Sequence, residues 1–477
     1  MTLRASSLAL TAALALSACT TVGPNFKPPA APAATGYAMS GDTPSAVGQL
    51  SPESRAAGVW WSAYGSPELD ATIRLALKNS PTIAEANATL QRAQAQVDAA
   101  AGGLSPQVDA TAGGQRERIN TQAFGFTGFP SPTINLYSIG GTVSYDLDLF
   151  GGRKRGVEAA RADAETEAHK ADAAYLTLTG NVAMQAFKIA TLRAQIAALD
   201  EVIADDRRTI DMTRRAEQAG GAAPSAISGG QGQLAKDEAQ RPALERDLAA
   251  ARHQLALLVG EAPATWIAPD FDLAAFKPVE SIPVAVPSSL VRNRPDILAA
   301  ASTLHADTAR IGVATANLYP DIRLTAGLTQ QAIEPGNLFR YSSSGWSLAG
   351  GVTAPLFHGG TLKANKRAAE AQAKASLARY QGTVLRAFVQ VADALTSLEQ
   401  DDRAVAALIR SEQSQASSLR DARKAYELGG GPLIQVIDAQ RELNRARQQT
   451  LAARGRRLSD TVDLFTATAA NWRPDNP

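Results

Sequence analysis

The 477-residue sequence contains a single cysteine, Cys19, so no intramolecular disulfide can form. Charge of neither sign is in excess: the formal net charge is +1 and charged residues make up 19% of the chain, which gives no basic face for nucleic acid. Aromatic residues are also few, at 5%. Stability must therefore come from packing and assembly, and we expect partners that are not selected by bulk charge.

The usual sequence motifs of enzymes are missing as well. The four histidines are scattered without the spacing of metal ligands. The glycine pairs Gly151-Gly152 and Gly229-Gly230 lack the Lys-Ser/Thr of a phosphate-binding loop, and no nucleophile elbow is present. We therefore predict that the protein is not an enzyme, needs no cofactor and holds no metal.

The sequence does contain a long internal repeat. Residues 81–113 reappear, without a gap, as residues 295–327, and residues 145–152 are answered by 353–360. Two copies of this length indicate pseudo-symmetry within one architecture rather than an array of short units. Each copy is predicted to run helix, strand, loop, strand and very long helix.

The very long helix of each copy is predicted from a run without proline. Residues 153–219 and 361–428 contain none, and at about 1.5 Å per residue each run would form a helix of roughly 100 Å. Helices of globular proteins average about a dozen residues. Runs of this length therefore indicate a coiled-coil-like assembly.

Both long runs end in glycines that are followed by a proline. Glycine suits the C-terminal cap of a helix and proline the first turn of the next, so we predict two antiparallel helical hairpins. Their return helices are residues 225–259 and 433–468, the first with a bend or break at Pro242. The residues at the predicted tips are Gly220, Gly221, Pro224 and Ser225 in the first hairpin, and Gly429, Gly430, Gly431, Pro432 and Leu433 in the second.

Four short segments alternate polar and apolar residues, as half-buried β-strands do. They are residues 107–114, 137–149, 321–329 and 346–356. Alternation alone favours an ordinary soluble sheet. However, aromatic residues near the segment ends (Tyr137, Trp346 and Phe357) and polar loops at 116–135 and 330–343 are typical of strands in an outer-membrane barrel.

The N-terminus has the pattern of an export signal. Arg4 precedes an apolar run over residues 5–16 that is too short to span a bilayer. Small residues then precede Cys19, which resembles the bacterial lipoprotein cleavage site, where the cysteine becomes the lipidated first residue. The residue after this cysteine is Thr20 rather than an aspartate, and by resemblance to bacterial lipoprotein sorting this implies the outer membrane. We predict a signal peptide at 1–18 and lipid on Cys19, with a simple secreted protein as the alternative.

Four strands cannot close a barrel by themselves. A membrane strand leaves no open edge, and bacterial single-chain barrels need at least about eight strands. The sequence therefore predicts an oligomer in which several chains contribute four strands each to one barrel and four helices each to one tube. Composition does not set the number of subunits.

Together these residues resemble the outer-membrane efflux proteins of the TolC and OprM type, and within them the NodT-like lipoproteins. The resemblance covers nearly the whole mature chain. The matching stretches are residues 22–28, Trp60 and Trp61, and residues 145–152, 255–260, 294–297, 311–314 and 355–360. It implies an α+β membrane protein with an internal two-fold repeat: a homotrimer with a shared twelve-stranded outer-membrane barrel and long helical hairpins that form a periplasmic α-barrel of twelve helices.

The same resemblance implies the channel subunit of a tripartite efflux system of the RND type. Small molecules would pass through it passively, from a periplasmic adaptor protein and an inner-membrane transporter to the exterior, and lipid of the outer membrane would surround the barrel. One alternative is the outer-membrane duct of type I secretion. Another is a periplasmic coiled-coil scaffold lipoprotein with soluble strands, and a hydrolase is a distant third.

The resemblance also points to a periplasmic gate. In the family, the tunnel closes where the second hairpin carries a tyrosine before its turn and two aspartates, three residues apart, after it. Tyr426 and Asp438 match two of these positions, whereas Gln435 stands where the other aspartate would be and Gly431 where an arginine can occur. Three copies of Asp438 would form a ring of carboxylates, which favours cation binding or raised pKa values. The alternative is an ordinary solvated charge, and the tips correspond to the family's adaptor-facing surface.

These predictions divide the chain into six parts. They are a signal peptide at 1–18, a lipidated, irregular and surface-draped segment at 19–66, a first repeat at 67–262, a linker at 263–287, a second repeat at 288–469 and a tail at 470–477. We expect the N-terminal segment, the linker and the tail to meet beside the helices.

Overall fold

The computed structural model describes residues 21–30, 34, 36–41, 49–51, 59–125, 127–279 and 283–468. The predicted signal peptide, Cys19 and the tail at 470–477 lie outside the described residues. The chain forms two compact units, Met1–Pro29 with Thr89–Glu167 and Ala299–Tyr380, and Ala30–Ala88 with Ala168–Leu298 and Gln381–Pro477. Both units draw on both repeats, and the boundaries predicted at 67–262 and 288–469 stay a prediction.

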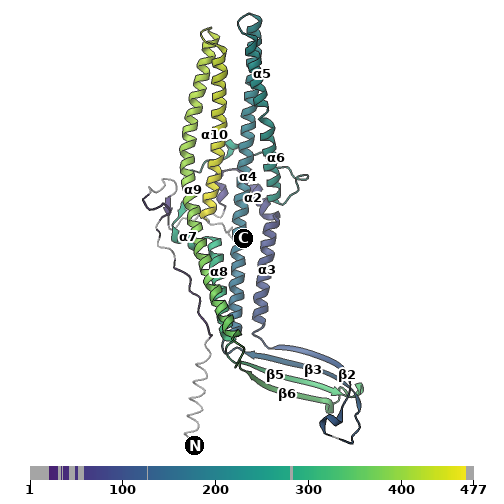
Figure 1. The fold of residues 1–477 in the computed structure, drawn as a ribbon. Coiled ribbons are helices and arrows are strands. Elements are labelled where there is room, and N and C mark those ends of the chain that lie inside the picture. The colour runs from purple at the N-terminus through teal and green to yellow at the C-terminus, as the bar shows by residue number, and fades with distance from the viewer. Residues whose placement is uncertain are drawn as a thin grey trace. The chain divides into compact units, whose positions relative to one another are not determined.

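The first unit contains the sheet and the helix ends that lead into it (Figure 1). In chain order the elements that contribute to it are α3 (Pro81–Gly102), β2 (Gln107–Arg118), β3 (Thr133–Leu147) and α4 (Gly152–Gln218), then α8 (Pro295–Ala316), β5 (Asp321–Ala332), β6 (Ser344–Thr353) and α9 (Thr361–Glu427). Most of α4 and most of α9 belong to the second unit. The order helix, strand, strand, long helix occurs twice, which confirms the predicted repeat.

The sheet has the order β2-β3-β5-β6, and all neighbouring strands are antiparallel. Its strands differ in length from the predicted segments. Gln115 to Arg118 pair with residues 133–136, so the first loop is shorter than expected. Alternation of polar and apolar residues marks a strand only where one face is apolar, whereas backbone pairing continues through polar residues. β6 ends at Thr353, two residues before Pro355, which has no N–H to donate.

The second unit contains the hairpins and the elements around their bases (Figure 1). Its further helices are α2 (Pro67–Asn79), α5 (Pro224–Glu238), α6 (Arg241–Val259), α7 (Pro287–Asn293) and α10 (Leu433–Thr468). Short elements are β1 (Gln49–Ser51), the 3-10 helices η1 (Trp60–Tyr64) and η3 (Leu273–Ala275), and β4 (Pro283–Ala285). The parallel pair β1 and β4 joins the N-terminal segment to the linker, so these two segments meet as expected.

The long helices match their predicted bounds closely, since α4 and α9 each have 67 residues. The first return helix is interrupted between Glu238 and Arg241, whereas α10 runs unbroken for 36 residues. Pro242 explains the interruption, because it has no N–H to donate to the carbonyl four residues earlier. The predicted break is therefore confirmed.

The end of the N-terminal segment corrects one expectation. It was predicted to be irregular and to lie on the surface, but Trp60, Trp61 and Tyr64 form a 3-10 helix and are at most 3% exposed. The Tyr64 ring lies 4.7 Å from that of Phe187 on α4, and the Trp60 ring 5.4 Å from that of Phe465 on α10. Burial of large apolar rings stabilises the folded chain, and here the rings fill the space between the two hairpins.

A close approach of α4 and α10 accompanies this packing. A Cβ atom at Gly455 of α10 would lie 2.2 Å from Oγ1 of Thr191 on α4, so only glycine fits at this crossing.

In the described part of the chain, the structure contains no helix that combines the length and the apolar character needed to cross a membrane.

Candidate channel wall and periplasmic gate

The strand register sorts the residues of the sheet into one apolar and one polar face. Val108, Val143, Ala326 and Leu348 lie side by side in one row across the four strands. The next polar row consists of Asp109, Thr142, Gly327 and Ser347. Large side chains of the apolar face are exposed in the single chain, including Trp346 at 81% and Leu348 at 76%. Such a surface requires an apolar environment.

The sheet also has two open edges. Within the described residues, β2 pairs only with β3, and β6 pairs only with β5. These edges are 12 and 10 residues long and present unpaired N–H and C=O groups. A long edge beside an exposed apolar face must be paired by another strand, because unpaired backbone groups are costly in lipid and aggregate in water. The geometry therefore requires further copies of the sheet.

Two aspartates connect the inner end of the sheet to α4. Asp146 at the end of β3 accepts hydrogen bonds from Arg153 and from Arg323, the latter at 2.6 Å. Asp148 accepts from the backbone N–H groups of Arg153 at 3.0 Å and Lys154 at 2.8 Å, and so caps the start of α4. The alternation predicted for residues 137–149 puts both aspartates on the polar side of that strand, but it contains no signal for these contacts.

The N-terminal stretch 22–28 is clasped by side chains of the same unit. Arg155 of α4 is 4% exposed and donates to the carbonyl of Val22 at 3.2 Å and to Oδ1 of Asn25 at 2.7 Å. The Phe26 ring stacks on His305 of α8 with 4.5 Å between centroids.

Glu158 completes this clasp. It accepts from Arg155 at 2.6 Å and lies 3.0 Å from Nε2 of His305. Burial acts to raise the pKa of Glu158, but the hydrogen bonds from Arg155 and His305 outweigh it and hold the pKa below its usual range. The sequence contains no signal for the roles of Arg155 and Glu158, because no local pattern connects residues about 130 positions apart in the chain.

Both hairpin tips close with the same cap. Gly220 and Gly429 have φ of 76° and 74°, in the left-handed region. The N–H of the next glycine then reaches back to the helix: Gly221 to the carbonyl of Ala216 at 2.7 Å, and Gly430 to that of Ala425 at 2.9 Å. This is the Schellman arrangement. The tip glycines thus have the turn geometry that the sequence predicted.

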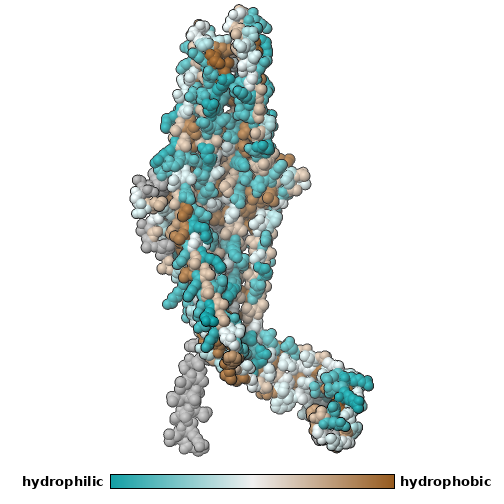
Figure 2. Space-filling model, in the orientation of Figure 1, coloured by the Kyte–Doolittle hydropathy of each residue, from teal (hydrophilic) through white to brown (hydrophobic). Residues whose placement is uncertain are grey.

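Large apolar side chains are exposed on both sides of the second turn. Pro224 and Ser225 open α5, and Leu433 opens α10 directly after Pro432. Leu428 and Ile434 are 78% and 54% exposed. In Figure 2 apolar colour lies near the tip of the α9 and α10 hairpin, whereas most of the visible helical surface is hydrophilic.

The three predicted gate residues lie close to this second tip. Tyr426 is half-buried and packs on the cluster of Leu419, Val436 and Leu443 inside the hairpin. Gln435 and Asp438 are exposed, and Asp438 lies 3.3 Å from Nη1 of Arg441. This arginine was not predicted as a partner of Asp438, although its spacing of three residues on a helix is a usual signal for an ion pair.

Arg423 of α9 connects the two hairpins close to the second tip. It lies 3.4 Å from Oδ2 of Asp205 on α4 and donates to Oε1 of Gln440 on α10 at 2.7 Å. The structure makes it a contact among three helices.

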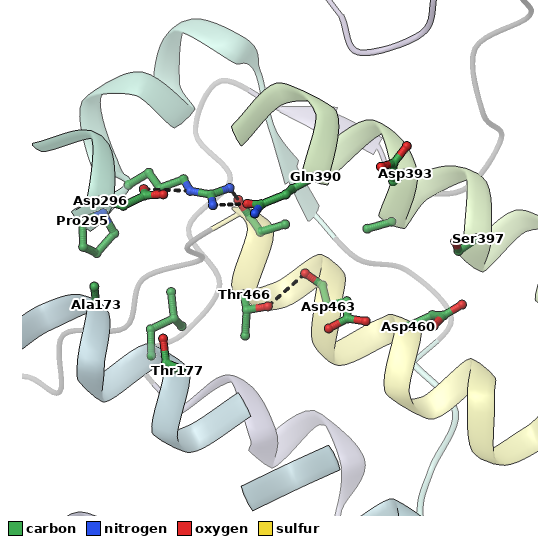
Figure 3. Close-up of a pocket in the computed structure, with 14 residues that line it drawn as sticks. Ala173, Thr177, Pro295, Asp296, Gln390, Asp393, Ser397, Asp460, Asp463 and Thr466 are labelled. Atoms are coloured by element: carbon green, nitrogen blue, oxygen red, sulfur yellow. Dashed lines mark hydrogen bonds and ion pairs between the residues drawn. The ribbon is translucent and has the colours of Figure 1, made fainter. Parts of the chain in front are cut away.

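The second unit also contains an acidic cavity of about 470 Å³ between α4, α8, α9 and α10 (Figure 3). Asp296, Asp393, Asp460 and Asp463 line it, and the buried Arg294 donates to Asp296 at 2.8 Å. Burial raises the pKa of Asp463. In the described part of the chain, no group of three or more His, Cys, Asp or Glu side chains is arranged to hold a metal ion.

The strand register, open edges and paired hairpins agree with the comparisons with known proteins. The family model described as outer membrane efflux protein matches residues 72–261 and 286–470, which correspond to the two repeats. The chain belongs to this family. Its predicted TolC-like fold, with long helices and four antiparallel strands per chain, is confirmed.

Individual relatives support the same assignment. The chain is 30% identical over 429 residues to the pyoverdine export outer membrane protein OpmQ of Pseudomonas aeruginosa, covering 87% of this chain and 88% of OpmQ. It is 27% identical over 467 residues to the probable outer membrane lipoprotein SilC of Salmonella typhimurium, covering 98% of each.

Among solved structures, the open state of the MtrE outer membrane channel of Neisseria gonorrhoeae superposes with a TM-score of 0.84 at 27% identity, over 95% of this chain and 99% of MtrE. The protein is therefore an efflux channel of the outer membrane, and the predicted location and transport role are confirmed.

Proposed function

We propose that three copies of this chain close one barrel and one helical tunnel, through which small molecules leave the periplasm passively. The two open edges beside an exposed apolar face carry this proposal, since β2 of one copy can pair with β6 of the next. The subunit contributes no chemistry of its own. Energy for transport comes from an inner-membrane transporter of the RND type, which docks through a periplasmic adaptor.

For the transported compounds we propose only a class, small molecules. OpmQ is named for pyoverdine export and CusC of Escherichia coli for cation efflux, and this chain is 30% and 27% identical to them, respectively. Relatives of similar identity thus carry different names for cargo, which supports a shared duct whose selectivity lies in its partners.

The experiment that tests the assembly combines native mass spectrometry of the detergent-extracted protein with recording in a planar bilayer. Trimers that give discrete current steps are expected. A detergent-independent monomer without current would contradict the shared barrel and favour the scaffold lipoprotein. Export of a polypeptide rather than of small molecules would favour the type I secretion duct.

We further propose that Tyr426, Gln435 and Asp438 form the periplasmic gate. Exposed Asp438 and Gln435 lie one helical turn apart on α10, and three-fold symmetry would bring three copies together at the axis. Asp438→Ala is expected to raise single-channel conductance. The matched control is Glu442→Ala, one turn further along α10 and also exposed; a conductance equal in both variants and the wild type would place the gate elsewhere.

The tip residues Gly220, Gly221, Pro224, Ser225 and 429–433 are proposed as the surface that meets the adaptor. Exposed Leu428 and Ile434 beside the second tip support this role, because apolar side chains at a helix end suit contacts with another helical tip. Ile434→Asp should weaken crosslinking to the adaptor and leave trimers intact. Unchanged crosslinking would exclude Ile434 from that surface.

Lipid attachment at Cys19 is proposed from the sequence and from the name of SilC, a probable outer membrane lipoprotein. Each buried methylene of an acyl chain contributes about 0.8 kcal/mol to membrane binding. Cys19→Ser should abolish labelling with radioactive palmitate while the barrel still inserts. Labelling that persists would exclude this residue as the attachment site.

A further inference from the structure

Each helical hairpin contains a pair of aspartates that face each other across its two helices. In the first hairpin Asp206 of α4 and Asp237 of α5 are neighbours, each directly before a member of the 2.8 Å ion pair Arg207–Glu238 that joins the two helices. In the second, Asp460 of α10 and Asp401 of α9 are neighbours, close to the ion pair Arg457–Asp402 that joins these two helices. Ionised carboxylates only accept hydrogen bonds and repel each other, so a proton shared between the two groups would convert each pair from a repulsive to a stabilising contact.

Neighbouring side chains donate hydrogen bonds to one member of the first pair and leave the other without a donor. Asp237 is 8% exposed, and its two oxygens accept from Nε2 of Gln233 and Nε2 of Gln240, both at 2.8 Å. Oδ2 of Asp206 is buried and, among the described residues, receives no N–H or O–H donor. A shared proton supplies the missing donor for this oxygen.

The charged groups around the first pair shift the pKa of Asp206 in opposite directions. Burial, the Asp237 carboxyl and the nearby Asp205 raise the pKa of Asp206 to about 7, while Arg441 of α10 acts to lower it. Nε of Arg441 is buried without an acceptor in the described residues. Other charged groups near the pair are Arg207 with Glu238, Arg208 and Arg423 with Asp205, and Arg241 with Asp200.

The position of this pair gives it mechanical importance. Asp237 lies in the last turn of α5, directly before the interruption that separates α5 from α6. A return helix that is interrupted has no continuous backbone hydrogen bonding to hold its end. The contact with Asp206, together with the 2.8 Å pair of Arg207 and Glu238, holds this end of α5 on α4.

The second pair repeats the arrangement at another level. Oδ2 of Asp401 is buried and lacks a donor among the described residues. Burial and the Asp401 carboxyl raise the pKa of Asp460 to about 6, with Asp463 adding to the effect and Arg456 opposing it. Asp460 lies at the acidic cavity (Figure 3). The other charged groups nearby are Asp402 with Arg457, Asp393, and Arg294 with Asp296.

We propose that the two pairs, Asp206 with Asp237 and Asp401 with Asp460, are carboxyl staples: each binds one proton, and each releases its two helices when the proton leaves. Loss of the proton from the first staple also adds a negative charge beside Arg441, which now pairs with Asp438 at 3.3 Å. Any effect on conductance through Asp438 rests on the proposed gate. The staples themselves do not.

The direction of the pH dependence follows from the raised pKa values. An unfolded aspartate has a pKa of about 4, so between about pH 4 and pH 7 the folded chain binds more protons than the unfolded one. The staples therefore contribute their full stability below about pH 4, and this contribution is lost as pH rises through about 6 and 7.

Hydrogen exchange on the detergent-solubilised full-length protein tests the first staple without any need for channel activity. Amides of α5 and of residues 203–210 should lose about tenfold in protection between about pH 6 and pH 8, after correction for intrinsic exchange. Asp237→Asn should abolish this loss, because its amide donates to Asp206 without a titrating proton. Asp211→Asn, an exposed residue of α4 paired with Arg214 at 2.9 Å, is the matched control and should behave as wild type.

Two further variants make the result decisive. Asp206→Asn should act as Asp237→Asn does and serves if the latter does not fold. Asp460→Asn should remove pH dependence only around residues 398–404 and 457–463. Protection that is independent of pH in the wild type, or a loss in α5 that persists in both asparagine variants of the first pair, would overturn the proposal.

Discussion

The two helical hairpins begin from the same plan and differ in how they return. Both leave the sheet through a 67-residue helix and turn with the same glycine cap. The first then returns as two helices, α5 and α6, and the second as the single helix α10. Both copies of the repeat have thus kept the same glycine cap, which requires a positive φ. A single proline interrupts one return helix and makes it less stiff than the other.

The difference extends to the proposed functions. All three proposed gate residues belong to the unbroken hairpin, whereas the staple beside the helix interruption belongs to the other. A stiff helix transmits a displacement of its tip along its length, and an interrupted one absorbs it at the interruption. We therefore interpret the first hairpin as the more compliant of the two.

The largest effect is expected where both hairpins meet the buried aromatic rings. Phe187→Ala should lower the free energy of unfolding by about 3 to 5 kcal/mol, because the side chain is fully buried against Tyr64 and Phe276. Urea unfolding in detergent measures it. Leu385→Ala, which removes a 64% exposed side chain of α9, is the control and should cost less than about 0.5 kcal/mol. Equal losses would contradict the aromatic core.

A proline placed in α10 should make the second hairpin resemble the first. Arg445→Pro removes a backbone hydrogen bond in the middle of the unbroken helix and should cost about 3 kcal/mol. The same unfolding assay measures the loss, and hydrogen exchange should show new opening near residue 441. Arg445→Ala removes the exposed pair with Glu442 but keeps the helix, and should have little effect.

The caps of the two tips should be equally sensitive. Gly220→Val and Gly429→Val each force a β-branched residue into positive φ, which costs about 1 to 2 kcal/mol. Faster exchange of the last helical turn reports the loss. At Gly430 a Cβ would come no closer than 3.7 Å to the carbonyl of Ala425, so Gly430→Ala is the mild control. A Gly429→Val variant that exchanges like Gly430→Ala would argue against the cap.

The smallest effect is expected from repairing the interruption. Pro242→Ala restores an N–H that can reach the carbonyl of Glu238, and should slow exchange of residues 239–243, with a gain of at most about 1 kcal/mol because proline is tolerated in a first helical turn. No slowing would mean that the Asp237 contacts, rather than the proline, set the interruption.

The local features of this protein could be predicted from its sequence because their causes are local. Proline-free periodic runs produced the bounds of α4 and α9 within a residue or two, and glycine before proline marked both tips. The repeat indicated which elements recur. Alternation found all four strands but not their ends, since Gln115 to Arg118 extend β2 by backbone pairing alone.

Only the tertiary structure decided which distant residues meet. The clasp of Arg155 on Val22 and Asn25, the burial of Trp60 and Trp61, and the contact of Arg423 with Asp205 join residues far apart in the chain. The same holds for the carboxyl staples, because the sequence does not distinguish a buried aspartate that keeps a proton from an ionised aspartate in solvent. Sequence alone determined helix, turn and strand, whose energies depend on neighbours in the chain; the protonation and pairing of buried charges depend on the neighbours that folding supplies.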